Sequence, residues 1–118
     1  MQLQVTEAFW ALFPTAHIGV VTAHALDNTV ACAAAETLLM TEASRQAAAL
    51  AGVDIATYPA VAPWRAAYAR FGVKPSQHRS SIESLLRSAQ AGRIRTINPL
   101  VDLYNAVSLR HALPCGGE

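Results

Sequence analysis

Polar side chains recur inside one of the most hydrophobic segments of the chain, INPLVDLYNAVSL at residues 97–109. Asn98 precedes a proline and fits a helix N-cap, and Asp102 could tie down a neighbouring loop. Asn105 lies mid-helix, where lining a pocket fits it at least as well as a structural role. An amide can hold a carbonyl group or a water molecule from either end, so this stripe is the first candidate site.

Charge is divided unevenly along the chain. Up to Pro63 one basic residue faces five acidic ones, a net charge of −4, whereas from Trp64 onward eight basic residues face three acidic ones, a net charge of +5. Arginine dominates the second half, and a guanidinium can grip a phosphate with two parallel hydrogen bonds. The second half is therefore either a surface for an anionic partner or an ordinary solvated face.

Other kinds of chemistry find little support in the sequence. Cys32 and Cys115 are far apart and lie in no CxxC pair, and the odd separation of His17 and His24 would place them on opposite faces of an extended segment. Glycine-rich phosphate loops, a GxSxG elbow and closely paired carboxylates do not occur. We expect no metal and no cofactor.

The spacing of apolar residues predicts one strand and four helices. Residues 17–26 are rich in β-branched residues and predict a buried strand, and residues 29–51 predict a long helix that packs on it. Helices are also expected over residues 63–71, over 80–91, where Ser80 and Glu83 have capping-box spacing, and over the segment from Asn98 to a point before Pro114. In the last of these, Leu100, Leu103, Tyr104 and Val107 form the apolar face.

A lone strand cannot satisfy its own backbone groups, so a partner is required. Either a weak strand lies within residues 53–58 or 93–97, or the sheet is completed by a missing C-terminal segment or by another chain in an oligomer. The expected fold class is α+β, with helices packed on a small sheet. A length of 118 residues predicts a single domain, 1–118. The sequence predicts neither a membrane span nor a secretory signal, which makes the cytoplasm the expected location.

Two segments in the second half of the sequence resemble a known family. The segments FGVKPSQHRSSIESLLR and INPLVDLYNAVSL resemble the B3/B4 domain, the tRNA-editing region of the phenylalanyl-tRNA synthetase β subunit, and more closely its free-standing relatives. The resemblance covers residues 64–117 strongly and implies the N-terminal portion of a B3/B4-like domain whose C-terminal part is absent. Tyr104 replaces a threonine of the family, and Gly116 stands where the synthetase domain has a histidine.

The resemblance implies hydrolysis of misacylated aminoacyl-tRNA in trans, without aminoacylation. Asn105 falls on the pocket-lining asparagine of the family and is the expected catalytic residue, and Tyr104, Asn98 and Asp102 are the expected substrate-binding residues. The acceptor end of tRNA is the expected partner. Its phosphates would meet basic residues of the second half, namely Lys74, Arg79, Arg87, Arg93 and Arg95. The alternatives are a non-catalytic RNA-binding or interaction module and a fragment with no function alone.

Overall fold

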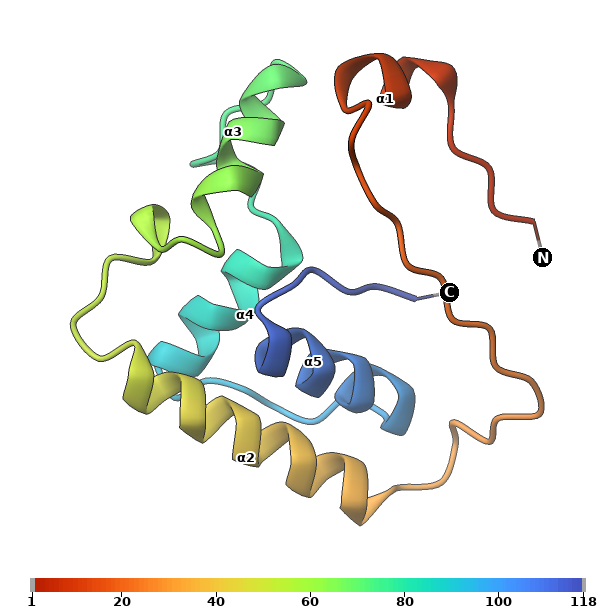
Figure 1. Ribbon diagram of the computed structural model, residues 1–118. Coiled ribbons are helices and arrows are strands. Elements are labelled where there is room, and N and C mark those ends of the chain that lie inside the picture. Colours follow the sequence, from red (N-terminus) through yellow and green to blue (C-terminus); the bar gives the residue numbers. More distant parts are fainter. Residues whose placement is uncertain (1, 118) are drawn as a thin grey trace.

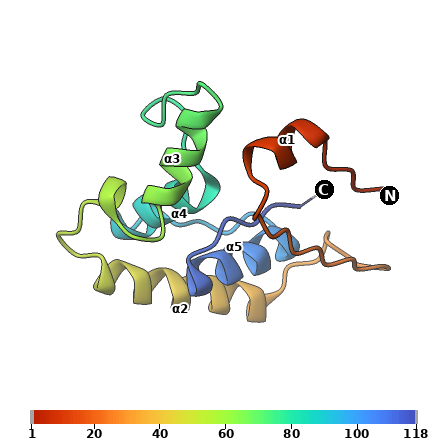
Figure 2. The ribbon, with the colours of Figure 1, turned by 45° about the horizontal axis from the view of Figure 1, so that its top comes forward.

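Helices make up all the regular secondary structure of residues 2–117, which the computed structural model describes. In chain order they are α1 (Glu7–Leu12), α2 (Ala33–Ala49), the short 3-10 helix η1 (Ile55–Thr57), α3 (Ala62–Arg70), α4 (Ser81–Gln90) and α5 (Pro99–His111). In Figure 1, α2 lies along α5 and α4, whereas α1 lies apart from them, on the far side of the molecule. Figure 2 shows the same separation from a second direction.

The hydrophobic core lies where α2, α4 and α5 meet. Leu39 of α2, Leu86 of α4 and Leu109 of α5 are fully buried there, and Ile55 and Val61 close the core from the connection between α2 and α3. Each buried leucine contributes roughly 1.5–3 kcal/mol through the removal of its side chain from water. Three mutually packed helices, α2 from the first half of the chain and α4 and α5 from the second, thus form the centre of the fold.

The boundaries of α4 follow from its end residues. Ser80 Oγ accepts a hydrogen bond from the backbone N–H of Glu83 at 3.4 Å, so half of the predicted capping box forms. The other half does not, because the Glu83 side chain turns toward arginines instead of its own helix start. Gly92, at φ +65°, reverses the chain after the last turn, as expected for a glycine C-cap.

The start of α5 is held by side chains from two parts of the chain. Asn98 Oδ1 accepts from Val101 N at 2.9 Å, and Asn28, in the loop before α2, accepts from Leu100 N at 2.8 Å. Pro99, in the first turn, has no N–H to satisfy. The predicted N-cap is confirmed, and the loop cap explains how the N-terminal segment is fixed to α5.

The predicted α+β fold is wrong, because residues 2–117 contain no sheet. Residues 17–26 form no strand and run along the outside of the molecule between α1 and α2 (Figure 1). Val21 is 94% exposed, so the segment is not buried either. β-branched residues favour an extended backbone, but only a paired neighbour makes a strand of it. The long helix packs on α4 and α5 rather than on a strand.

Neither of the weaker strand candidates forms. Residues 55–57 coil into η1, which starts where Asp54 Oδ1 accepts from Ala56 N at 3.0 Å. Residues 93–97 form an irregular connection between α4 and α5. The long helix begins at Ala33 rather than near residue 29, because Asp27 accepts from the backbone and hydroxyl of Thr29 and holds a turn there.

The apolar ridge of α5 faces solvent in part, contrary to its spacing. Leu103 and Val107 are 46% and 41% exposed, whereas Asp102, Ala106 and Leu109 are buried. The buried face is set by α2, which places the side chain of Gln46 within 2.6 Å of the carbonyl oxygen of Leu109. The face of α5 that packs in the core is therefore the one with Asp102, Ala106 and Leu109, which also recur at helical spacing.

The N-terminal part packs loosely on the rest. Phe13 stacks edge-on against Phe71 with ring centroids 5.2 Å apart, and the Arg70 guanidinium lies 4.7 Å from the Phe13 centroid. The solvent-accessible area is 8133 Å², against about 6,200 Å² for a compact protein of this mass. The radius of gyration is 15.5 Å, against about 13.5 Å for a compact domain of this length. The fold is therefore open rather than tightly closed.

A salt bridge joins α2 to the end of α5. The nearly buried carboxylate of Glu42 accepts from Arg45 Nε and from Arg110 Nε, both at 2.8 Å. The hydrogen bond from Arg45, followed by the one from Arg110, lowers the pKa of Glu42 below its ordinary value of 4.5. The acidic first half and the basic second half are thereby connected.

Two leucines on α5 test which face of the helix is buried. Leu109→Ala should lower the free energy of unfolding by about 2–5 kcal/mol, because it removes fully buried methyl groups. Leu103→Ala, the matched control on the same helix, should cost less than about 1 kcal/mol. Urea unfolding of both variants measures the difference. Equal losses would contradict the burial described here.

The Glu42 salt bridge predicts sensitivity to acid. Because folding lowers the pKa of Glu42, the ionised carboxylate stabilises the protein above about pH 4.5. This contribution disappears as the pH falls through the lowered pKa of the folded state. Urea unfolding from about pH 6 to about pH 3 should show a smaller loss of stability for Glu42→Gln than for the unmodified protein. Glu36→Gln, on the same helix, should keep the loss, and an unchanged slope in Glu42→Gln would refute the prediction.

Candidate nucleic-acid interface

A buried carboxylate gathers arginines from three parts of the second half. Glu83 Oε1 accepts from Arg65 Nη1 of α3 at 2.8 Å and from Arg87 Nε and Nη2 at 3.0 and 2.9 Å. Arg79, just before α4, places its Nε 3.7 Å from the same oxygen. The arginine cluster, as we call Arg65, Arg79, Arg87 and Glu83, thus has one anionic centre and three cationic groups.

Burial makes this arrangement necessary. Glu83 is fully buried, and a carboxylate without cations would be strongly unfavourable there. Its second oxygen, Oε2, has no hydrogen-bond partner among residues 2–117. The three guanidinium groups are one-quarter to one-half exposed. The cluster therefore presents a net charge of +2 at the surface.

A cavity of about 450 Å³ lies beside the arginine cluster on the outer face of α4. Arg79 and Arg87 line it together with Arg93, which follows the C-terminal turn of the helix. The remaining wall carries polar or small groups and no acidic one: Ser84, Ser88, Gln90 and Ala91. Guanidinium and hydroxyl donors around an acid-free hollow suit an anion, and phosphate matches the guanidinium geometry best.

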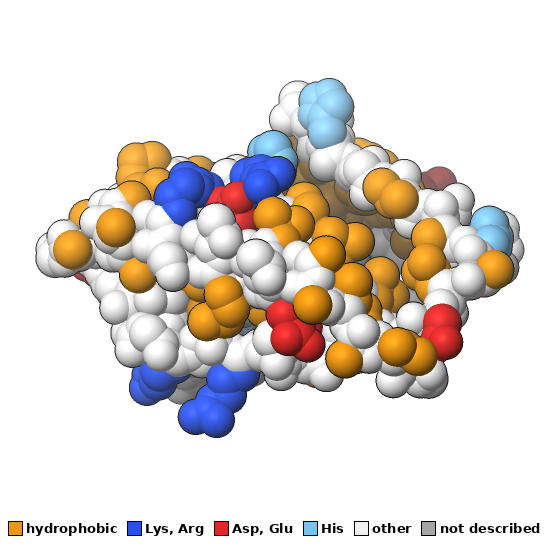
Figure 3. Space-filling view, turned by 90° about the horizontal axis from the view of Figure 1, so that it is seen from below, with side chains coloured by type: hydrophobic (Ala, Val, Ile, Leu, Met, Phe, Trp, Pro, Cys, Tyr) orange, Lys and Arg blue, Asp and Glu red, His pale blue; other side chains and the backbone are white. Residues whose placement is uncertain are grey.

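The predicted basic residues are only partly brought together. Arg79, Arg87 and Arg93 share the cavity, whereas Lys74 and Arg95 are exposed and lie outside its lining. Figure 3, seen from the side of α2, shows that Lys and Arg side chains do not cover this face but gather at separate edges of it. Apolar side chains fill the hollow between the helices and the N-terminal segment in the same view.

Asn98 and Asp102 organise the start of α5. The Asn98 oxygen caps the helix, and the buried Asp102 accepts from the backbone N–H of Ile97 at 2.8 Å. Both residues make the structural hydrogen bonds expected of them, and their role in substrate binding stays a prediction. A substrate would have to compete with backbone N–H groups for these oxygens.

Tyr104 and Asn105 are half-buried on α5. Within residues 2–117 the Asn105 side chain makes no hydrogen bond, so its amide is available to a ligand. The Tyr104 ring carbon Cε1 lies 3.4 Å from the position that a Cβ on Gly117 would occupy, so the C-terminal tail crosses the ring. Neither residue lines the cavity on α4. The structure does not bring Asn105 and the arginines into one pocket.

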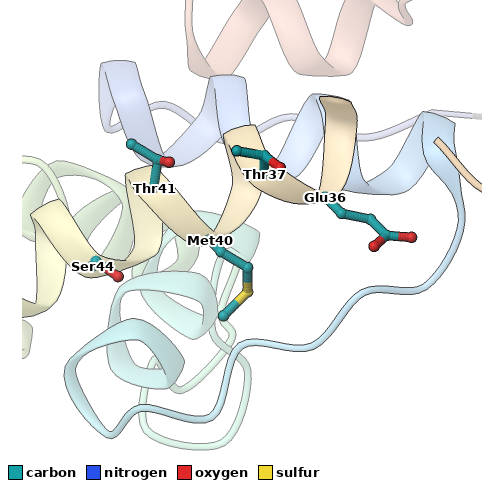
Figure 4. A pocket seen from close by; sticks show the side chains of 5 residues that line it. All are labelled: Glu36, Thr37, Met40, Thr41 and Ser44. Carbon is teal, nitrogen blue, oxygen red and sulfur yellow. The ribbon is translucent and has the colours of Figure 1, made fainter. Parts of the chain in front are cut away.

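A second hollow, of about 600 Å³, follows α2 and is less suited to binding. Its lining comes from α2 alone: Glu36, Thr37, Met40, Thr41 and Ser44. Figure 4 shows Thr37 and Thr41 on one side of the helix and Met40 on the other, so these side chains do not converge on a common point. A single helix offers only one wall, and we assign no site to this hollow.

The described residues contain neither a cluster of candidate metal ligands nor a helix that could cross a membrane. Among residues 2–117, no three His, Cys, Asp or Glu side chains gather closely enough to hold a metal ion. Cys32 and Cys115 are both unpaired thiols. No helix in this part of the chain has the length and apolar character needed to cross a membrane.

Comparison with known families agrees with the motifs of the second half. Residues 63–118 match the family model of the B3/4 domain. The matched segment is just under half of the chain, and it is similar to the B3/4 domain family. The family is related to the β subunit of phenylalanyl-tRNA synthetase, so the predicted resemblance is confirmed over these residues. The matched residues include α4 and α5 and the arginines that line the cavity on α4. Neither the curated proteins nor the solved structures contain a match to the chain.

Some residues at this interface were not predicted from the sequence. Arg65 contacts Glu83 across 18 positions, and no local spacing indicates that contact. Ser84 and Ser88 lie one helical turn apart on the face of α4 that carries Arg87, a signal that helical periodicity could have given. The ion pairs of Arg79 and Arg87 with Glu83 also follow helical spacing.

The arginine cluster predicts unequal costs for its members. Glu83→Gln should lower the free energy of unfolding by about 3–5 kcal/mol, because it leaves guanidinium groups around a neutral buried side chain. Arg79→Gln, at a half-exposed group 3.7 Å from the carboxylate, should cost less than about 1 kcal/mol. Urea unfolding tests both variants. A mild effect of Glu83→Gln would show that the cluster is not needed for the fold.

Proposed function

We propose that this chain, through its B3/4-like segment, binds the acceptor end of tRNA and hydrolyses the ester of a misacylated tRNA in trans. The acid-free cavity with three arginines, inside the segment that matches the family, is the observation that supports it most. Phosphate contacts of this kind position a nucleic acid without reading its sequence. Such a protein would act in the cytoplasm and would catalyse no aminoacylation.

Ester hydrolysis suits a site without a strong nucleophile. Water adds to the ester carbonyl carbon, the bond from that carbon to the ribose oxygen breaks, and the ribose oxygen takes up a proton. Free amino acid and tRNA result. Because the aminoacyl ester is already activated, the site needs only to position water and the carbonyl and to stabilise developing charge.

Asn105 is the proposed catalytic residue. Its amide N–H can donate to the ester carbonyl oxygen, or its amide oxygen can accept a hydrogen bond from the attacking water. The side chain makes no hydrogen bond within residues 2–117, so it is available for either role. Tyr104 would contact the amino acid, while Asn98 and Asp102 support the site from the start of α5. Asn105 lies outside the arginine cavity, so the RNA would have to extend from α4 to α5 to bring the ester to it.

The phosphate backbone would meet basic side chains beyond the cavity as well. Lys74 and Arg95 are exposed on either side of α4 in the sequence and would add to the attraction exerted by Arg79, Arg87 and Arg93. Binding of this kind weakens steeply with salt, because condensed counterions are released from the nucleic acid.

A non-catalytic RNA-binding module is the second candidate. The location of Asn105 outside the arginine cavity favours it, because an editing site would have to be formed by other walls. This candidate predicts tRNA binding with the same salt dependence but without release of amino acid.

The deciding experiment uses tyrosine-charged phenylalanine tRNA as the probe. Intact protein should release tyrosine, and Asn105→Ala should slow the release by about 100-fold while binding of the tRNA changes little. Gln77→Ala, at an exposed turn before α4, is the control and should keep full turnover. Binding without release would favour the non-catalytic module, and full turnover in Asn105→Ala would exclude Asn105 from the mechanism.

A further inference from the structure

The arginines of the α4 cavity have donor capacity that the protein does not use. Within residues 2–117, neither Arg79 nor Arg93 makes a side-chain hydrogen bond. Arg87 directs Nε and Nη2 at Glu83 and leaves Nη1 without a partner there. Two complete guanidinium groups and part of a third are thus available beside one hollow.

Two hydroxyl groups complete the set of donors. Ser84, Arg87, Ser88 and Ala91 recur at helical spacing and share one face of α4, and all four line the cavity. Neither serine side chain is hydrogen-bonded within the described residues. Ala91 has only a methyl side chain, so it takes up little of the cavity that Arg87 and Arg93 also line.

Glu83 makes the cavity more than a solvated basic surface. It binds two nitrogens of Arg87 and attracts Arg79, so both guanidinium groups are held near the cavity before any ligand arrives. Preorganised donors lose less conformational entropy on binding than flexible surface side chains do. The buried carboxylate faces the arginines and contributes nothing to the cavity lining.

The chemistry selects an anion with several oxygens. The lining carries three positive charges and no negative one. Its donors come from three parts of the chain: the segment before α4, α4 itself and the segment after it. A carboxylate presents two oxygens in one plane, whereas a phosphate can accept from planar guanidinium forks and from hydroxyl groups together. A volume of about 450 Å³ also leaves room for the neighbouring sugar or base.

We infer that the cavity formed by Arg79, Ser84, Arg87, Ser88 and Arg93 binds one phosphodiester group of single-stranded RNA. This inference deepens the proposed function: it assigns the RNA contact to one site rather than to the whole basic half. It depends on the proposed function only for the identity of the molecule that carries the phosphate.

Three variants that each lower the net charge by one test the site. Ser84→Asp places a carboxylate in the cavity near the N-terminal end of α4, where an acid is compatible with the helix dipole. Arg93→Gln removes a donor that has no structural partner in residues 2–117. Arg70→Gln is the matched control, because Arg70 lies over Phe13 and away from the cavity. Circular dichroism and thermal unfolding confirm that each variant is folded.

Binding of a short single-stranded RNA is measured by fluorescence anisotropy at several salt concentrations. Ser84→Asp and Arg93→Gln should weaken binding by about tenfold or more, and Arg93→Gln should reduce the salt slope by about one, whereas Arg70→Gln stays within about twofold of the unmodified protein. Millimolar inorganic phosphate should compete with the RNA. Equal weakening in all three variants would overturn the inference in favour of diffuse attraction.

Two further outcomes separate this inference from the proposed function. Binding of inorganic phosphate in the cavity without binding of RNA would overturn RNA as the carrier. Protein that binds RNA through the cavity but releases no amino acid would contradict the editing proposal and support the phosphodiester site. The opposite result is also possible: the protein deacylates tRNA, while Ser84→Asp and Arg93→Gln bind RNA as well as Arg70→Gln does. That result would support the editing proposal and contradict the phosphodiester site.

Discussion

The second half of the molecule depends on the ion pairs between the buried Glu83 carboxylate and its neighbouring arginines. A charge with no exposed surface can persist only where cations surround it, and Arg65 and Arg87 supply them from two helices. The ion pair therefore fixes α3 against α4 while the leucines of the core fix α4 against α2 and α5. The same contact sets the direction of the guanidinium groups at the surface, so one interaction stabilises the fold and shapes the candidate interface.

The sequence predicted those elements whose signals are local. Helices α4 and α5 begin at the expected caps, Ser80 and Asn98, because a cap depends on residues within one turn. The absence of a sheet from residues 2–117 was not predictable in the same way. Residues 17–26 have the composition of a strand, but a strand exists only when a second segment pairs with it, and local composition cannot specify that partner. Loop residues such as Asn28 likewise act at a distance of 72 positions.

The candidate site shows the same division between local and distant information. Arg79 and Arg87 bracket Glu83 at four-residue spacing, so their association follows from the sequence, whereas the contribution of Arg65 does not. Asn105 was singled out correctly as a polar residue without a capping role, yet a pocket around it requires walls from several elements. The buried face of α5 was also predicted wrongly, because Leu109 and Ala106 pack in the core with α2 and α4 while Leu103 stays exposed.

The asymmetry of charge along the chain becomes informative only in three dimensions. Arg110 is engaged by Glu42 of the acidic half, and Arg70 lies against Phe13, so neither adds freely to an anion-binding surface. The positive charge that remains is concentrated around α4, where the cavity has no acidic wall. Salt screens exposed charges beyond about 8–10 Å, so a partner responds to this local excess and not to the net charge of +1. A chain that is nearly neutral overall can for this reason still present a selective site for phosphate.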